Sequence, residues 1–250
     1  MTFTAKIRKN PAKQKEYNMQ ETITKQAESP AAEAAVILPY EVTKEYYIEQ
    51  LPPLEKKLAY SFFKRVGDVV FALLGIAITA IPMLVIALLI KVKMGGTIFY
   101  KQTRLGLDGK PFNIIKFRTM AMDAEADGAQ WSEGEADTRI TKLGAMLRQF
   151  RLDELPQFFN VIAGNMSLVG PRPERPCFYE AFEKYIHGFS QRLVVKPGIT
   201  GLAQVNGGYS LRPEEKIIHD VEYIKTRSLW LDFTILLRTV TIVLFRKGAK

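Results

Sequence analysis

The strongest hydrophobic pattern in the chain runs from Val69 to Ile90, where 22 residues in succession carry no charge. As a helix this stretch would be about 33 Å long, which matches the hydrocarbon thickness of a bilayer. Basic residues flank it, Lys64 and Arg65 before it and Lys91 and Lys93 after it. Positive flanks are typical of the cytoplasmic side of a membrane helix. We therefore expect residues 61–93 to form a membrane segment.

Pro82 lies inside this stretch and cannot donate a helix hydrogen bond, which permits a sharp bend. A single crossing would place one basic end on the wrong side of the membrane. A bend at Pro82 would return the chain to the face that it entered, as a re-entrant helix. A kinked helix that crosses once is the alternative, and the pattern alone favours neither.

The pattern before the membrane segment is different. In residues 1–60, lysine and glutamate alternate with alanine, and apolar runs are short. Such a segment can bury little apolar surface, so we expect a largely disordered or weakly helical tail, with a weak amphipathic helix between Tyr46 and Tyr60. No apolar run follows the first basic residues, so we expect no signal peptide.

Residues 94–250 show the mixed pattern of an α/β (α+β) domain. The patterns predict strands over residues 97–100 and 111–117 around a turn at 106–110, and helices over 142–150, 213–224 and 229–245. Asp232 and Arg238 interrupt the last apolar run. These charges favour an amphipathic helix in the membrane interface over a buried span.

Composition narrows the function. The chain has 250 residues and a net charge of +9, which requires an acidic partner or surface. Lipid phosphates can supply it. Aromatic residues do not alternate with a basic stripe, so we expect no nucleic acid partner. One cysteine, Cys177, excludes a disulfide framework and any CxxC metal site.

Two adjacent carboxylates, Asp153 and Glu154, are the first candidate for chemistry. Asp153 has the character of a helix N-cap before Pro156, and the helix would end near Gly164. Neighbouring helical side chains diverge by about 100°, so the pair does not suit a glycosidase. One nucleophile or metal ligand with a supporting neighbour fits better. A cap beside a solvated acid is the structural alternative, and on these two residues alone it is favoured.

Cations occur on both sides of this pair in the sequence. Pro171 and Pro173 stiffen the backbone around Arg172, whose planar guanidinium can bind phosphate oxygens in pairs. Strand alternation places Lys116 and Arg118 on one face, as an anion-binding pair would require. Ordinary surface cations remain the alternative for each of them.

Taken together, these motifs resemble the bacterial sugar transferases, the monotopic phosphoglycosyl transferases also called polyprenyl-phosphate hexose-1-phosphate transferases. The resemblance covers roughly residues 60–250 and rests on five motifs in order: Lys64-Arg65-x-x-Asp68 before an apolar stretch with an internal proline, Lys116-Phe117-Arg118-Thr119-Met120, Leu152-Asp153-Glu154-Leu155-Pro156-Gln157, Ser167 to Pro173, and Lys196 to Val205. Where the family often has Ser-Pro at the membrane bend, this chain has Ile81-Pro82, and Thr79 is a nearby candidate to replace the serine hydroxyl. With this resemblance we expect the helix to be re-entrant.

The resemblance implies a reaction and a site. The family transfers a sugar 1-phosphate from a UDP-sugar to undecaprenyl phosphate and releases UMP at the cytoplasmic face of the bacterial inner membrane, the first membrane step of exopolysaccharide or other envelope glycan synthesis. It implies Asp153 as the nucleophile and Mg²⁺ ligand and Glu154 as its support. It implies Lys116 and Arg172 as phosphate contacts, with Arg118 and Asp232 as further candidates for substrate binding.

Other readings stay open at this stage. A non-catalytic, membrane-anchored protein that binds lipid phosphate is the main alternative, and a glycan hydrolase or translocase subunit is another. Neither the sugar nor the oligomeric state follows from the sequence, so a homo-oligomer is compatible with it. The segment from Glu174 to Phe178 resembles exopolysaccharide-initiating members of the family.

Overall fold

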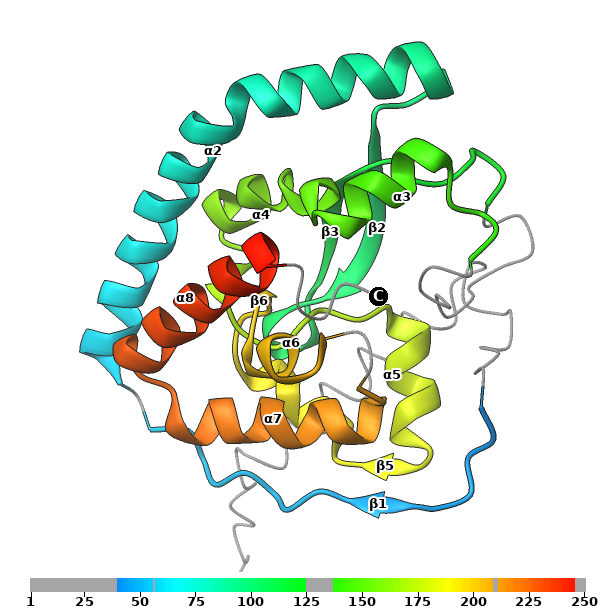
Figure 1. Cartoon of the computed structure of the whole chain (residues 1–250). Coiled ribbons are helices and arrows are strands. Elements are labelled where there is room, and N and C mark those ends of the chain that lie inside the picture. Colours follow the sequence, from blue (N-terminus) through cyan, green and yellow to red (C-terminus); the bar gives the residue numbers. More distant parts are fainter. Residues whose placement is uncertain (1–39, 56, 125–136, 209–210, 246–250) are drawn as a thin grey trace, which may run out of the picture.

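The structure is a computed structural model that describes residues 40–55, 57–124, 137–208 and 211–245. Helices surround three small pairs of strands (Figure 1). β1 (Tyr46–Tyr47) pairs in parallel with β5 (Ile186–His187), and β4 (Ser167–Val169) in parallel with β6 (Gly198–Thr200). β2 (Phe99–Leu105) and β3 (Pro111–Phe117) form an antiparallel hairpin. The expected mixture of helix and sheet is confirmed.

The hairpin agrees with the predicted strand, turn and strand. Its turn is the short 3₁₀ segment Leu107–Gly109, where Asp108 and Gly109 both have positive φ. Turns of this kind favour Asp and Gly because both tolerate the left-handed region. Register pairs Tyr100 with Lys116, so β3 delivers Lys116 near its end.

Helices form over the ranges predicted for 142–150, 213–224 and 229–245 and before Gly164, whereas those over Pro176–Glu183 and Leu202–Asn206 were not predicted. Their bounds are α2 (Leu58–Met94), α3 (Lys142–Gln149), α4 (Gln157–Ala163), α5 (Pro176–Glu183), α6 (Leu202–Asn206), α7 (Pro213–Thr226) and α8 (Leu229–Phe245). Thr141 caps α3 by accepting a hydrogen bond from the Gly144 amide at 3.0 Å. Two further 3₁₀ segments occur in the described chain, η3 (Leu152–Glu154) and η4 (Phe189–Val194).

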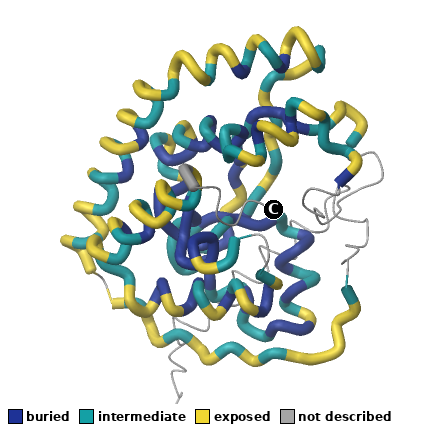
Figure 2. Tube along the Cα trace, in the orientation of Figure 1, coloured by how far each residue is buried: buried dark blue, intermediate teal, exposed yellow. Residues whose placement is uncertain are grey.

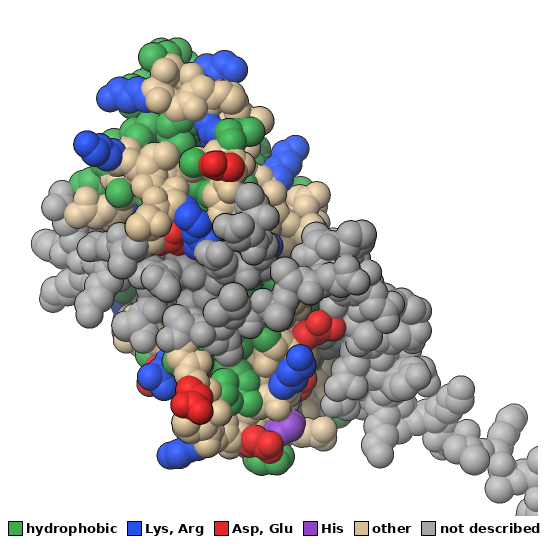
Figure 3. Space-filling model, turned by 90° about the vertical axis from the view of Figure 1, so that its right-hand side faces the viewer, with side chains coloured by type: hydrophobic (Ala, Val, Ile, Leu, Met, Phe, Trp, Pro, Cys, Tyr) green, Lys and Arg blue, Asp and Glu red, His purple; other side chains and the backbone are tan. Residues whose placement is uncertain are grey.

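α2 is a 37-residue helix with Pro82 inside it, and it is bent into two arms (Figure 1). Its outer surface is apolar and exposed along both arms (Figure 2). By length and composition it is the one helix in the described chain that could cross a membrane, and only 11% of its most apolar window is buried. Hydrophobic and basic side chains lie together at the upper end of the molecule in Figure 3, the end reached by α2 in Figure 1.

Thr79 does not replace the missing serine in the way expected from the sequence. Pro82 frees the carbonyl of Ile78, four residues earlier. The Thr79 hydroxyl donates instead to the carbonyl of Gly75, at 2.6 Å. A threonine in a helix commonly bonds to the carbonyl one turn before itself, and this preference decides its partner here.

The weak helix expected between Tyr46 and Tyr60 is wrong. The chain is extended at β1, and α2 begins only at Leu58. Backbone hydrogen bonds from Tyr46 to Tyr185 (2.7 Å) and from Ile48 to His187 (3.0 Å) hold the extended segment against β5. Long-range pairing has therefore replaced a marginal local helix. The remainder of the predicted tail, residues 1–39, lies outside the described residues, as do residues 125–136.

Candidate active site

The dyad of Asp153 and Glu154 lies in η3, between α3 and α4. Arg151 precedes it in the left-handed conformation, with φ of 54°. The Arg151 carbonyl accepts a hydrogen bond from the Glu154 amide at 3.2 Å. Pro156, not Asp153, occupies the N-cap position of α4, so the prediction that Asp153 caps this helix is wrong. The end of α4 at Gly164, with φ of 86°, is confirmed.

Both carboxylates are buried, with Asp153 7% and Glu154 5% exposed. Burial penalises a carboxylate unless partners compensate for the lost water. The two residues differ in how far they are compensated. This difference divides their chemical roles.

Glu154 is paired with two cations. Lys116 donates to its Oε1 at 3.0 Å, and Arg172 donates to the same oxygen. Burial alone would raise the pKa of Glu154, but Arg172 and Lys116 outweigh it and hold the pKa well below its usual value. Glu154 is therefore ionised throughout the physiological range and fixes both cations beside Asp153.

Asp153 receives no hydrogen bond from any side chain in the described part of the chain. Burial raises its pKa to about 6, and the opposing effect of Lys116 is not enough to restore the usual value. The carboxyl group thus keeps its oxygens for a reaction partner or a metal ion. Near neutral pH enough of it is ionised to act as a nucleophile.

Arg172 is placed by the close approach of β4 and β6. The Gly170 amide donates to Thr200 and the Gly198 amide to Pro171, both at 2.9 Å. A Cβ atom on Gly170 would lie 2.4 Å from the Lys196 carbonyl oxygen. Only glycine fits there, and the following segment carries Arg172 to Glu154.

The structure does not bring Arg118 into this group. Its guanidinium donates to the carbonyls of Met94 (3.3 Å) and Gly95. β3 ends at Phe117, so strand alternation no longer applies at Arg118. The expected pair of Lys116 and Arg118 is not formed. The second cation on the dyad is Arg172.

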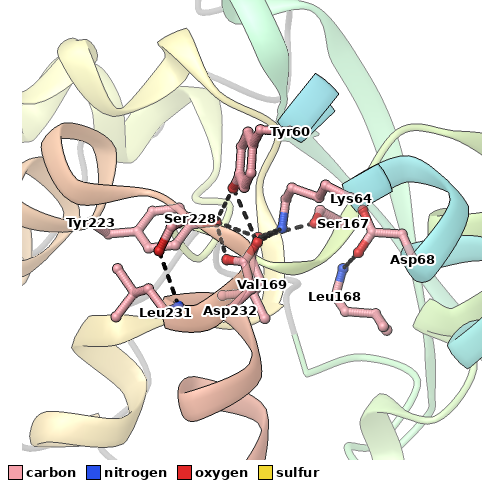
Figure 4. A network of polar contacts seen from close by, with 10 residues as sticks. All are labelled: Tyr60, Lys64, Asp68, Ser167, Leu168, Val169, Tyr223, Ser228, Leu231 and Asp232. Carbon is pink, nitrogen blue, oxygen red and sulfur yellow. Dashed lines mark hydrogen bonds and ion pairs between the residues drawn. The ribbon is translucent and has the colours of Figure 1, made fainter. Parts of the chain in front are cut away.

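Asp232 also lies in a different cluster, shown in Figure 4. Its carboxylate accepts hydrogen bonds from Lys64 (2.9 Å), Tyr60 (3.0 Å) and Tyr223 (2.7 Å). These donors come from α2 and α7. The described contacts of Asp232 are thus with protein groups, and none is with the dyad.

Two arginines near the dyad were not singled out from the sequence. Arg148, at the end of α3, lowers the pKa of Asp153, and its Nε donates to the Thr119 hydroxyl at 2.9 Å. Arg151 acts in the same direction on Glu154. The signal was available, because both arginines lie within five residues before Asp153 in the sequence. Together with Lys116 and Arg172, these arginines create a positively charged environment suited to a diphosphate.

Magnesium is the metal that this donor set can accept. Mg²⁺ prefers oxygen ligands and is commonly held by one or two carboxylates together with substrate phosphates and water. No group of three or more His, Cys, Asp or Glu side chains in the described residues could hold a metal by itself. Asp153 offers carboxylate oxygens that no described side chain engages, so an ion shared with a phosphate substrate fits this site.

Comparisons with known proteins identify the relatives of this chain. A family model described as bacterial sugar transferase matches residues 59–246. A UDP-N-acetylgalactosamine-undecaprenyl-phosphate N-acetylgalactosaminephosphotransferase of Aeromonas hydrophila is 42% identical over 204 residues, covering 80% of this chain and 48% of the relative. A UDP-glucose:undecaprenyl-phosphate glucose-1-phosphate transferase of Klebsiella pneumoniae is 41% identical, covering 75% of this chain and 41% of the relative.

A second glucose-1-phosphate transferase of the same description, from Caulobacter vibrioides, is 43% identical and covers 77% of this chain and 74% of the relative. The chain therefore spans about half the length or less of the Aeromonas and Klebsiella proteins, but most of the Caulobacter protein. The family match includes α2 except for its first residue, all of α8 and every residue of the cluster around Asp153. On the family match and on these relatives, the chain belongs to the bacterial sugar transferase family.

Proposed function

We propose that this protein transfers a sugar 1-phosphate from a UDP-sugar to undecaprenyl phosphate and releases UMP. The observation that carries the proposal is the contrast within the dyad, in which Glu154 binds two cations and Asp153 is buried beside them without a described donor. The names of the relatives support the acceptor and the class of reaction. A place at the first membrane step of exopolysaccharide or another envelope glycan follows from this chemistry.

Asp153 acts as the nucleophile in this proposal. A carboxylate oxygen forms a bond to the phosphorus that bears the sugar, and the bond from that phosphorus to the bridging oxygen breaks. The bridging oxygen keeps the electron pair and leaves with UMP. An oxygen of undecaprenyl phosphate then attacks the same phosphorus, which releases the Asp153 carboxylate and forms the lipid diphosphate. Water-soluble and lipid substrates thus react in separate steps.

The cations offset the charge that would otherwise oppose this attack. Lys116 and Arg172 are held next to Asp153 through Glu154, and they can donate to the phosphate oxygens of the donor. Mg²⁺ held by Asp153, when bound, would neutralise charge that develops on the diphosphate. Burial removes competing water from the nucleophile.

The pH dependence of the first step should report the ionisation of Asp153. Because burial raises its pKa to about 6, the reactive carboxylate is lost as the pH falls through that value. We expect kcat/KM for the donor to fall about tenfold per pH unit below pH ~6 and to be flat above pH ~7. Initial rates of UMP release measure this, with a return to neutral pH as the control for damage. Because Mg²⁺ on the carboxylate would lower its pKa, the profile is measured at limiting Mg²⁺, where an acid limb near pH ~4, typical of an ordinary aspartate, would contradict the assignment.

The function itself is tested with detergent-purified protein, undecaprenyl phosphate, Mg²⁺ and a panel of UDP-sugars. The panel includes UDP-glucose and UDP-N-acetylgalactosamine, because relatives are named for both sugars. We expect UMP release from one donor, its loss with EDTA, and its recovery on addition of Mg²⁺. Without the lipid we expect a burst of about one UMP per enzyme. Folded protein that releases no UMP from any donor would overturn the proposal.

We also propose that α2 enters the bilayer and returns to the same face, with the catalytic domain on the cytoplasmic side of the bacterial inner membrane. Both arms of α2 bond to the rest of the chain: Asp68, before the bend, accepts from the Leu168 amide at 3.0 Å, and the Met94 carbonyl, after it, accepts from Arg118 at 3.3 Å. The bend of α2 is seen in Figure 1. α8 exposes Trp230 and other apolar residues, which in this arrangement lie in the membrane–water interface.

Single-cysteine labelling in a variant that lacks Cys177 tests this arrangement. Residues 57 and 96, one on each side of α2, should both react from the cytoplasmic side only. Reaction of the two positions from opposite sides of the membrane would show a single crossing and overturn the re-entrant arrangement.

A further inference from the structure

Asp232 lies at the centre of a polar cluster that joins α2, α7, α8 and β4 (Figure 4). Its Oδ2 atom accepts from Lys64 at 2.9 Å and from Tyr60 at 3.0 Å, and its Oδ1 atom accepts from Tyr223 at 2.7 Å. The residue is 7% exposed. Both carboxylate oxygens are thus engaged by protein donors, and a second anion near this carboxylate would be repelled.

The same donors reach the backbone of β4. Lys64 Nζ donates to the Val169 carbonyl at 3.1 Å. The Tyr223 hydroxyl, whose one proton points to Asp232 at 2.7 Å, also lies 3.2 Å from that carbonyl. Val169 is the last residue of β4 and comes three residues before Arg172. Asp232 therefore orients two side chains that also hold the start of the Arg172 segment.

Two further contacts tie the first arm of α2 to the catalytic groups. Asp68 accepts a hydrogen bond from the Leu168 amide at 3.0 Å, in β4. Arg65 donates to the carbonyls of Val161 (2.6 Å) and Ile162 (2.9 Å) at the end of α4, the helix that follows the dyad. A local pairing of Asp68 with Arg65 and Lys64, which lie three and four residues before it on α2, is not among its described contacts. Each side chain instead has a distant partner.

We propose that Asp232 is a positioning residue that holds Lys64 and Tyr223 against the Val169 carbonyl. It thereby keeps α2 and the segment that carries Arg172 in a fixed position relative to each other. The phosphate-binding arginine then keeps its place only while α2 is docked. The resemblance had offered Asp232 as a substrate-binding residue, and the saturation of its carboxylate by protein donors argues for the positioning role. The inference rests on the proposed transferase activity.

The first measurement does not depend on activity. Hydrogen exchange of the wild-type protein in detergent, without substrate, is compared with that of Lys64→Met, Asp232→Asn and Tyr223→Phe. Peptides that cover residues 167–175 should exchange faster in all three variants. Lys93→Met, which changes an exposed lysine of α2 outside the cluster, is the matched control and should exchange as the wild type.

The second measurement separates positioning from substrate contact. Lys64→Met and Asp232→Asn should each lower kcat by about 10- to 100-fold with KM for the donor changed less than about threefold, because a small misplacement of Arg172 is felt mainly in the transition state. The kcat of the double variant should be no lower than that of the less active single variant, because both changes break the same contact. Lys64→Arg keeps the cation and should recover most of the activity.

The outcomes are distinct. A wild-type protein without UMP release would overturn the proposed function and leave the exchange comparison to decide the coupling of α2 to β4. An active wild type in which Asp232→Asn raises KM for a substrate and Lys64→Met does not would overturn the positioning role. Additive losses in the double variant, or unchanged exchange over residues 167–175, would also overturn it. Should Asp232→Asn not fold, Tyr223→Phe and Lys64→Met give the same comparison, with Lys64→Arg as the conservative variant.

Discussion

Replacement of Asp153 by asparagine is expected to abolish UMP release, with a fall in rate of about 10⁴-fold or more, the range seen when a catalytic nucleophile is removed. Asparagine has nearly the same shape but cannot form the phosphoester bond. The measurement is single-turnover UMP release with the donor that the wild type uses. Asp123→Asn, at an exposed aspartate in the segment after β3, is the matched control and should keep the wild-type rate.

The same substitution should not reduce stability. Burial raises the folded-state pKa of Asp153 to about 6, above its value in an unfolded chain. A raised carboxyl pKa means that ionisation opposes folding, so this group contributes less stability as the pH rises through that range. Neutral asparagine should therefore leave the melting temperature at neutral pH unchanged or higher. Loss of activity together with retained folding is also the result that a non-catalytic lipid-phosphate binder would not give.

An active Asp153→Asn variant would show that another group carries the phosphosugar. Glu154 is the nearest carboxylate, but its oxygen is bonded to both Lys116 and Arg172. Its lowered pKa also makes it the weaker nucleophile of the two. The division of roles within the dyad thus rests on the surroundings of each carboxylate, since the two residues carry the same functional group.

The sequence predicts well those features that depend on neighbouring residues. The hairpin, the helices α3, α7 and α8 and the end of α4 at Gly164 all follow from local periodicity and from turn-forming residues. The dyad could be singled out because two adjacent acids before a proline are unusual in a packed core. The helix predicted between Tyr46 and Tyr60 was wrong because the conformation of this segment depends on its pairing with β5, about 140 residues away.

Partners distant in sequence account for the other errors. Lys64 and Asp232 are 168 residues apart, and Asp68 and the Leu168 amide are 100 residues apart. Spacing within α2 by itself points to local pairs, because a single helix brings together only residues three or four positions apart. The prediction that Arg118 shares a face with Lys116 was wrong because side-chain alternation holds only within a strand, and β3 ends at Phe117, one residue before Arg118.

Arg172 should prove the more important of the two cations on Glu154. Arg172→Ala is expected to lower kcat/KM for the UDP-sugar by about 10²- to 10³-fold, the usual cost of removing a group that stabilises charge in a transition state. Arg172→Lys should recover only part of this loss, because an ammonium cannot donate in pairs to Glu154 and to a phosphate as the planar guanidinium can. Initial rates at several donor concentrations, with Lys184→Ala at an exposed lysine as the control, measure both effects.

The loss should appear mainly in the first half-reaction. Arg172 is carried by the segment that the Val169 carbonyl and the close contact of Gly170 with β6 hold in place, so its guanidinium is fixed before the donor binds. A fixed donor needs no reorganisation as charge develops on the diphosphate, and its removal should slow the UMP burst more than the later transfer to lipid. An Arg172→Ala variant with a normal burst and slow turnover would place this arginine on the lipid phosphate instead, and the assignment of the donor side of the site would have to be reversed.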